Sequence, residues 1–276
     1  MLVVLLAAAL HAGWNALVKS GNDPLTDTVT VIAGSAVIGT VGILLLPPPA
    51  APSWPFLAAS VGVHIIYYSL LVLAYRAGDL SLMYPIMRGS APAITAVLAV
   101  VIVGERPSAG GWAGILMVST GVLLLAADAP RARSGSGFKP ILFALLNAGV
   151  IVAYSLVDAS GARRSGHAFS YTCWLLTIAG VLFCGLSLRG RARSVAPCLG
   201  AHLPKLFLGG ACTLGAYSLA LWAMTRAPVA SVAALRETSI VFSAFFAVFL
   251  LKERISPLRY LSMGVVTIGA VAIKLF

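Results

Sequence analysis

Ten long, predominantly apolar stretches follow one another along this chain, and they constrain its fold more than any other feature. They lie at residues 2–18, 26–46, 54–75, 80–103, 108–126, 138–160, 168–188, 202–224, 229–251 and 257–276. A helix that crosses a bilayer needs about 20 such residues. Strands of a membrane barrel instead alternate polar and apolar side chains over about 10 residues, a pattern that this sequence does not sustain. The stretches therefore predict an all-α integral membrane protein with ten transmembrane helices.

The composition supports a membrane protein and argues against a soluble one. Hydrophobic residues make up 60% of the chain and charged residues 10%, whereas soluble domains average about 45–50% and about 25%. The net charge is +11, and most of the basic residues lie between the apolar stretches, where an anionic bilayer surface is their expected partner. We therefore expect a multi-pass protein of the cell membrane, of the bacterial inner-membrane type, that does not bind nucleic acid.

The sequence lacks the motifs of an enzyme. No Walker loop is present, so we expect no nucleotide hydrolysis. The cysteines lack the spacing of metal ligands, and we interpret them as small apolar residues; they are Cys173, Cys184, Cys198 and Cys212. We therefore expect no catalytic residue, metal or cofactor, and we expect that work done on a solute depends on a gradient.

An internal repeat organises the chain. The shift that aligns Arg88 with Arg236 also aligns Gly104-Glu105-Arg106 with Lys252-Glu253-Arg254. The repeat predicts two five-helix halves, residues 1–128 and 138–276. Because five is odd, the second half enters the membrane with the opposite orientation. Inverted repeats are typical of transporters whose solute site lies between the halves near the middle of the membrane.

Small residues recur at every fourth position in the fourth and ninth stretches. They are Ala91, Thr95 and Ala99 in one and Ser239, Ser243 and Ala247 in the other. Small residues on one helix face allow two backbones to approach closely in a membrane. We therefore expect these two spans to pack tightly against each other.

Three charged residues lie inside predicted spans, where each costs about 2.5–3.5 kcal/mol and suggests a function. They are Arg88 in the fourth span, and Arg236 and Glu237 at the equivalent place in the ninth. One interpretation is an internal ion pair between Glu237 and either arginine that only holds the halves together. The other is a pair of guanidinium groups that bind a carboxylate or phosphate of a solute.

Further polar and aromatic residues within the spans predict a cavity. Tyr84 lies one turn before Arg88, and His11 lies one turn before Asn15. We assign substrate binding to Arg88, Arg236, Tyr84, His11, Trp14, Asn15, Tyr68, Tyr154 and Tyr217. Glu237 and His11 are the candidates for proton coupling. His64 and Asp158 also lie on polar faces of the third and sixth spans, and the pattern assigns them no role.

Several segments resemble the drug/metabolite transporter superfamily and its EamA branch in particular. They are residues 11–15 with Lys19, residues 84–88 through Gly104-Glu105, and residues 227–229 through 252–254. The resemblance implies a basket in which spans one, three, four, six, eight and nine surround a central cavity, with spans five and ten at its edge. It also implies an exporter of amino acids or related metabolites. Its implied cytoplasmic termini disagree with the distribution of basic residues, which places both termini outside.

Together these features predict a secondary transporter that exports a small metabolite, such as an amino acid, by alternating access through a central cavity. The arginines favour an anionic or zwitterionic solute, and protons are the candidate coupling ion. Two alternatives stay open: a non-transporting membrane scaffold or accessory subunit, and an uptake permease for organic anions.

Overall fold

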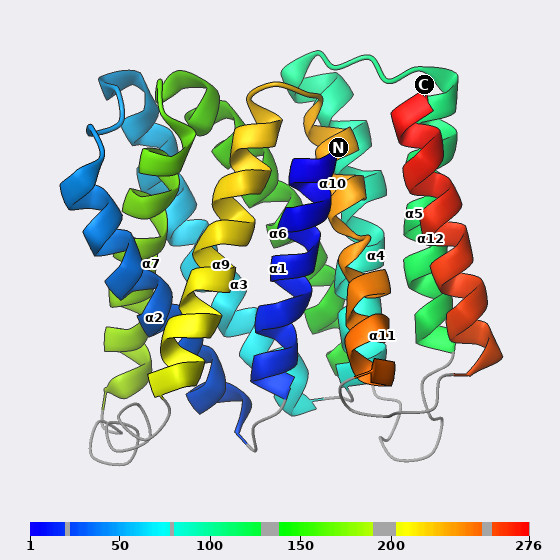
Figure 1. Ribbon diagram of the computed structural model, residues 1–276, viewed down its shortest axis with the longest axis horizontal. Helices are drawn as coiled ribbons and strands as arrows, with labels where there is room; N and C mark the ends of the chain where they lie inside the picture. The colour runs from blue at the N-terminus through cyan, green and yellow to red at the C-terminus, as the bar shows by residue number, and fades with distance from the viewer. Residues whose placement is uncertain (20–22, 78–79, 128–137, 190–202, 250–255, 276) are drawn as a thin grey trace.

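The computed structural model describes residues 1–19, 23–77, 80–127, 138–189, 203–249 and 256–275. The long helices in these ranges are α1 (Leu2–Lys19), α2 (Pro24–Leu45), α3 (Trp54–Ala77), α4 (Leu80–Leu98), α5 (Ala109–Ala127), α6 (Phe138–Arg164), α7 (Ala168–Leu188), α9 (Leu203–Met224), α10 (Val229–Arg236), α11 (Ser239–Phe249) and α12 (Pro257–Leu275). A 3₁₀ turn, η1 (Ala51–Ser53), precedes α3, and a π-helical turn, η2 (Ala99–Val103), follows α4. Figure 1 shows the helices standing side by side, with both chain termini at the same end of the molecule.

The helices are apolar on their outer surfaces as well as inside. Seven of those described are long and apolar enough to cross a membrane, and shorter apolar helices lie at Leu2–Val18 and Ala109–Leu124. Leu44 and Val101 are 80% and 76% exposed, which suits contact with lipid rather than water. The predicted all-helical membrane class is therefore confirmed, and the count of ten spans stays a prediction.

The helix starts follow local sequence signals. Asp23 precedes α2, and its carboxylate accepts hydrogen bonds from the backbone N–H groups of Leu25 (3.4 Å) and Thr26 (3.1 Å). Pro24 occupies the first helical position, where its missing N–H costs nothing. His167 has the same role before α7, where its Nδ1 accepts the N–H of Ser170 at 3.2 Å.

The ninth apolar stretch is broken, whereas its sequence predicts one continuous span. Helix α10 ends at Arg236 and α11 begins at Ser239. The Thr238 hydroxyl donates to the carbonyl of Leu235 at 2.7 Å, so a side chain replaces part of the regular backbone ladder at the break. Glu237 lies within the break, directly after Arg236, and these two are the charged residues of stretch 229–251.

The expected tight packing of the fourth and ninth spans along their small residues is wrong. Helix α4 packs mainly on α5 and α6, and the part of the ninth stretch that contacts it is α10 rather than α11. The physical reason is the break after α10, which ends the straight helix face on which the expectation depended. Within the described part of the chain, the small residues Ala91 and Thr95 are nevertheless buried.

Glycines bring other helices into close contact. A Cβ atom on Gly114 of α5 would lie 2.8 Å from the carbonyl oxygen of Gly269 on α12, and the converse distance is also 2.8 Å. A Cβ atom on Gly210 of α9 would meet the backbone of Gly34 on α2, and a Cβ atom on Gly34 would meet the backbone of Leu206 on α9. These contacts allow backbone-to-backbone packing without a hydrophobic driving force. Helices α5 and α12 form a pair at one edge of the molecule (Figure 1), as the family resemblance implies for spans five and ten.

Candidate functional site

A small cavity lies where α1, α3, α6, α9 and α10 converge, with α2 and α7 also contributing to its wall. Its lining residues are His11, Trp14, Ile32, His64, Tyr67, Tyr68, Tyr154, Leu176, Thr213, Ala216, Tyr217 and Arg236. The volume open to the centres of water molecules is about 40 Å³. Since one water needs at least about 10–15 Å³ on this measure, the cavity has room for a few waters in this conformation.

Aromatic rings form most of the cavity wall. The His64 ring lies 4.8 Å from that of Tyr154 and 5.6 Å from that of Tyr217, measured between centroids. Tyr67 links Tyr154 at 5.5 Å with Tyr68 at 5.3 Å. Edge-to-face and tilted contacts of this kind are favourable and restrict ring motion. The aromatic cavity expected from Tyr68, Tyr154 and Tyr217 is therefore present, and these residues come from three different helices.

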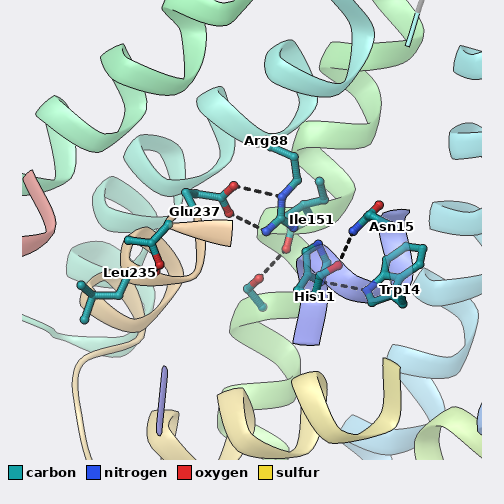
Figure 2. A network of polar contacts seen from close by, with 9 residues as sticks. His11, Trp14, Asn15, Arg88, Ile151, Leu235 and Glu237 are labelled. Atoms are coloured by element: carbon teal, nitrogen blue, oxygen red, sulfur yellow. Dashed lines mark hydrogen bonds and ion pairs between the residues drawn. The ribbon is translucent and has the colours of Figure 1, made fainter. Parts of the chain in front are cut away.

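Arg88 and Glu237 form a buried, bidentate ion pair between α4 and the end of α10. Nε of Arg88 donates to Oε2 of Glu237 at 3.0 Å, and Nη2 lies 2.6 Å from Oε1. Their side chains are 3% and 4% exposed. Figure 2 shows the two contacts beside α1. Of the two interpretations drawn for these charges, the ion pair therefore applies to Arg88, and neither partner is among the residues that line the cavity.

Arg236 has different surroundings from Arg88, although the repeat makes the two positions equivalent. It is 6% exposed and lines the cavity. Its guanidinium lies 5.4 Å from the centre of the Tyr217 ring, within the range of a cation–π contact. In the described part of the chain, no carboxylate oxygen lies within 4.0 Å of it. A buried cation that makes no direct contact with a carboxylate is costly, so Arg236 is suited to receive an anion.

His11, Trp14 and Asn15 form a local network on α1 (Figure 2). Nε1 of Trp14 donates to Nδ1 of His11 at 3.1 Å. Because an indole N–H only donates, Nδ1 of His11 holds the lone pair, and the neutral ring carries its hydrogen on Nε2. The Asn15 amide donates to the carbonyl of His11 at 2.8 Å. His11 and Trp14 line the cavity, whereas Asn15 is not among its lining residues.

Tyr84 lies within α4, but its side chain is outside the described residues. The structure therefore brings His11, Trp14, Tyr68, Tyr154, Tyr217 and Arg236 together at one cavity. It places Arg88 and Glu237 in a neighbouring ion pair.

Asp158 of α6 belongs to the site although no role was assigned to it from the sequence. It is fully buried and accepts a hydrogen bond from the hydroxyl of Tyr171 on α7 at 3.0 Å. The hydroxyl of Tyr217 on α9 also donates to it, and the Ser60 hydroxyl on α3 lies close by. An acidic residue inside an apolar span is itself a signal of function. The presence of a polar residue in an apolar span identifies both Asp158 and His64 in the sequence. It does not indicate which side chains they contact.

Contacts of the Glu105 carboxylate join the segment after α4 to α6 and α10, where α10 begins. We call these contacts the Glu105 latch; α10 begins at the end of the molecule that carries the termini (Figure 1). Glu105, after η2, accepts the N–H groups of Val229 at 2.7 Å and Ala230 at 3.3 Å, at the start of α10. Arg163 of α6 contacts the same carboxylate at 3.3 Å and donates to the carbonyl of Met224 at 2.9 Å. A carboxylate at a helix N-terminus satisfies free backbone donors and interacts favourably with the helix dipole.

The comparisons with known proteins agree with this picture. Residues 139–275 match the EamA-like transporter family. The chain superposes on a solved structure titled "Crystal structure of protein" with a TM-score of 0.80, over 99% of this chain and 96% of that one. Sequence identity is 18%, so this likeness shows the fold alone. No curated protein matches the sequence. The matched family is a transporter family, and the match covers about half of the chain, in its C-terminal part.

Proposed function

We propose that this chain is a gradient-driven transporter that moves a small carboxylate-bearing metabolite, such as an amino acid, through the cavity between its two halves. The proposed direction is export, as the family resemblance implies, from a cell of the bacterial type across its inner membrane. Arg236 carries the proposal. It is a buried guanidinium on the cavity wall with no carboxylate of the described residues within 4.0 Å.

The chemistry around Arg236 favours a zwitterion with an apolar part. A guanidinium binds a carboxylate with two parallel hydrogen bonds, which fixes its orientation. The rings of Tyr68, Tyr154 and Tyr217 offer apolar faces beside that charge, and a cationic amine is attracted to such faces. The combination suits an amino acid better than a fully polar anion.

Two inverted halves, residues 1–128 and 138–276 with five spans each, are the architecture that we propose for this mechanism. Helix α1 packs on α9 while α6 packs on α3, which is the exchange expected if a two-fold axis relates the halves. In Figure 1, α1 descends from the end with the termini and α6 ascends towards it. Such an arrangement supports alternating access, because each half takes the role of the other as the cavity changes sides.

Two sets of contacts between the halves, the Glu105 latch and the Arg88–Glu237 pair, determine how the cavity closes and opens. The cavity is too small for an amino acid in this conformation, so a solute requires the helices to separate. The Glu105 latch holds the end with the termini together and is the contact that opens on that side. The Arg88–Glu237 pair joins the halves beside the cavity. Glu237 and His11 remain the proton-coupling candidates from the sequence, and Tyr84 and Asn15 remain candidates for solute contact.

A thermal-shift screen of the purified protein against the twenty amino acids and a panel of organic acids tests this proposal. A solute that binds the folded state stabilises it by about 2.7 kcal/mol at 100 times its Kd, so the midpoint rises. Arg236→Gln is expected to abolish the shift. Arg226→Gln, whose guanidinium lies over Trp222 outside the cavity, is the matched control and is expected to keep it.

Flux measured in proteoliposomes distinguishes an exporter from an uptake permease and from a protein that does not transport. Export predicts exchange of the bound amino acid, which Arg236→Gln removes. A shift with organic acids alone favours an uptake permease for organic anions. Absence of any shift and of any flux favours a scaffold or accessory subunit and overturns the proposal.

A further inference from the structure

Asp158 has an unusual environment for a carboxylate. It is 0% exposed, and no Lys, Arg or His nitrogen of the described residues lies within 4.0 Å of its oxygens. Its hydrogen-bond donors among the described residues are the neutral hydroxyls of Tyr171 and Tyr217, and the Ser60 hydroxyl is near it. Glu237, by contrast, is neutralised by the bidentate contact with Arg88. A buried carboxylate that has no cation avoids a large desolvation cost by taking up a proton.

His64 connects Asp158 to the cavity. Its Nδ1 lies 3.0 Å from the carbonyl oxygen of Ser60 and 3.1 Å from the Ser60 hydroxyl. A carbonyl only accepts, so Nδ1 carries a hydrogen and Nε2 holds the lone pair of the neutral ring. The Ser60 hydroxyl then accepts from Nδ1 and is free to donate its own hydrogen to Asp158. The ring of His64 lines the cavity, which has room for water.

We propose that Asp158 is a further proton-binding site of this protein, beside the candidates Glu237 and His11, and that His64 and Ser60 form its path from the cavity. A proton from the cavity adds to Nε2 of His64, and the ring passes its Nδ1 hydrogen to the Ser60 oxygen. Ser60 transfers its original hydroxyl hydrogen to the Asp158 carboxylate. Ser60 is a neutral hydroxyl again, His64 is neutral with its hydrogen on Nε2, and Asp158 is a neutral carboxyl.

The groups that face Asp158 explain how its protonation affects binding of the solute at Arg236. The titratable or charged groups on the surrounding helices are His64, Tyr67 and Tyr68 on α3, Tyr154 on α6, Tyr171 on α7, Tyr217 on α9, Arg236 on α10, and Arg88 on α4, which Glu237 neutralises. Tyr217 is the link, because its hydroxyl bonds to Asp158 and its ring lies under the Arg236 guanidinium. Protonation of Asp158 therefore changes the hydrogen bond of the residue that supports Arg236. This coupling rests on the proposed transport function, whereas the proton site itself does not.

Infrared difference spectroscopy across a pH jump tests the proton site without any solute. Wild-type protein is expected to show the carbonyl band of a protonated carboxyl, and Asp158→Asn to lack it. The double variant Arg88→Met/Glu237→Leu removes a second buried carboxyl, that of Glu237, with its counter-charge and is expected to keep the band. Tyr171→Phe removes one donor and shifts the band, which preserves the test if Asp158→Asn fails to fold. A band absent from wild type, or present in a folded Asp158→Asn, overturns the proposal.

Transport in proteoliposomes tests the coupling, with an amino acid identified by the thermal-shift screen as the probe. In Asp158→Asn, accumulation of the amino acid under an imposed pH difference is expected to fall relative to exchange of labelled for unlabelled amino acid. Accumulation equal to wild type refutes the coupling. If wild type exchanges no amino acid, the proposed function fails, and the infrared result still decides whether Asp158 binds a proton.

Discussion

Removal of one partner from the Arg88–Glu237 pair is expected to destabilise the protein far more than removal of both. Both side chains are almost completely buried, and their two contacts measure 2.6 and 3.0 Å. At an effective dielectric constant of about 20, charges at this separation attract by about 6 kcal/mol. Desolvation of the two ions costs several kcal/mol each and offsets that attraction. The net contribution of the pair is therefore small, but each ion alone is strongly unfavourable.

The two single variants, Glu237→Gln and Arg88→Gln, are expected to differ in stability, because Arg236 adjoins Glu237 in the chain. Glu237→Gln leaves Arg88 and Arg236 in the protein interior without the acid that both interact with. Arg88→Gln leaves Glu237 with Arg236 as a remaining cation. A broken buried pair costs about 3–5 kcal/mol, and we expect Glu237→Gln at the upper end and Arg88→Gln below it.

Equilibrium unfolding in detergent micelles, monitored by circular dichroism, measures these differences. The double variant Arg88→Met/Glu237→Leu is expected to lie within about 1.5 kcal/mol of wild type, because apolar replacement of a buried pair is often neutral. Arg164→Gln, which removes an exposed arginine, is the control for loss of positive charge and is expected to change stability by less than about 0.5 kcal/mol. Equal effects of the two single variants, or a double variant as unstable as either, would refute the electrostatic reasoning.

Three further predictions concern packing, the latch and the cavity. Gly114→Ala places a methyl against the α12 backbone and is expected to cost about 1–3 kcal/mol in the same unfolding assay, whereas Gly149→Ala, with nothing within 4 Å, is not expected to create a clash. Glu105→Ala removes the cap of α10 and is expected to cost about 1 kcal/mol and to speed amide hydrogen exchange in the first turn of that helix; unchanged exchange would contradict the latch. Tyr217→Phe loses a buried donor and is expected to cost about 1–3 kcal/mol, more than Tyr154→Phe, and the reverse order would count against the hydrogen-bond network.

Much of the cavity was predictable because its residues are polar or aromatic within apolar spans. His11, Tyr154 and Arg236 stand out from their neighbours by residue type alone, and the structure brings them to one cavity. The cost of a polar group in lipid makes such residues informative wherever they occur. The same criterion marked Asp158, but its role depends on Tyr171 and Tyr217, which lie on other helices.

The predicted repeat does not extend to the environments of its two arginines. It equates Arg88 with Arg236, yet one is paired with Glu237 and the other faces the cavity. The single acid beside Arg236 has no counterpart beside Arg88, where Gly89 stands. One carboxylate cannot neutralise two arginines, so the two halves differ at this point.

The sequence by itself determined the membrane class and the residues that are too polar to face lipid, because both follow from local composition. The tertiary structure decided which of these residues meet. Arg88 and Glu237 are 149 positions apart, and only helix packing brings their charges together. That packing depends on where glycines let backbones touch, as between α5 and α12, and on the break that ends α10 after Arg236. Which polar residues come into contact depends on how all the helices of the bundle pack, and the sequence of a single span does not determine it.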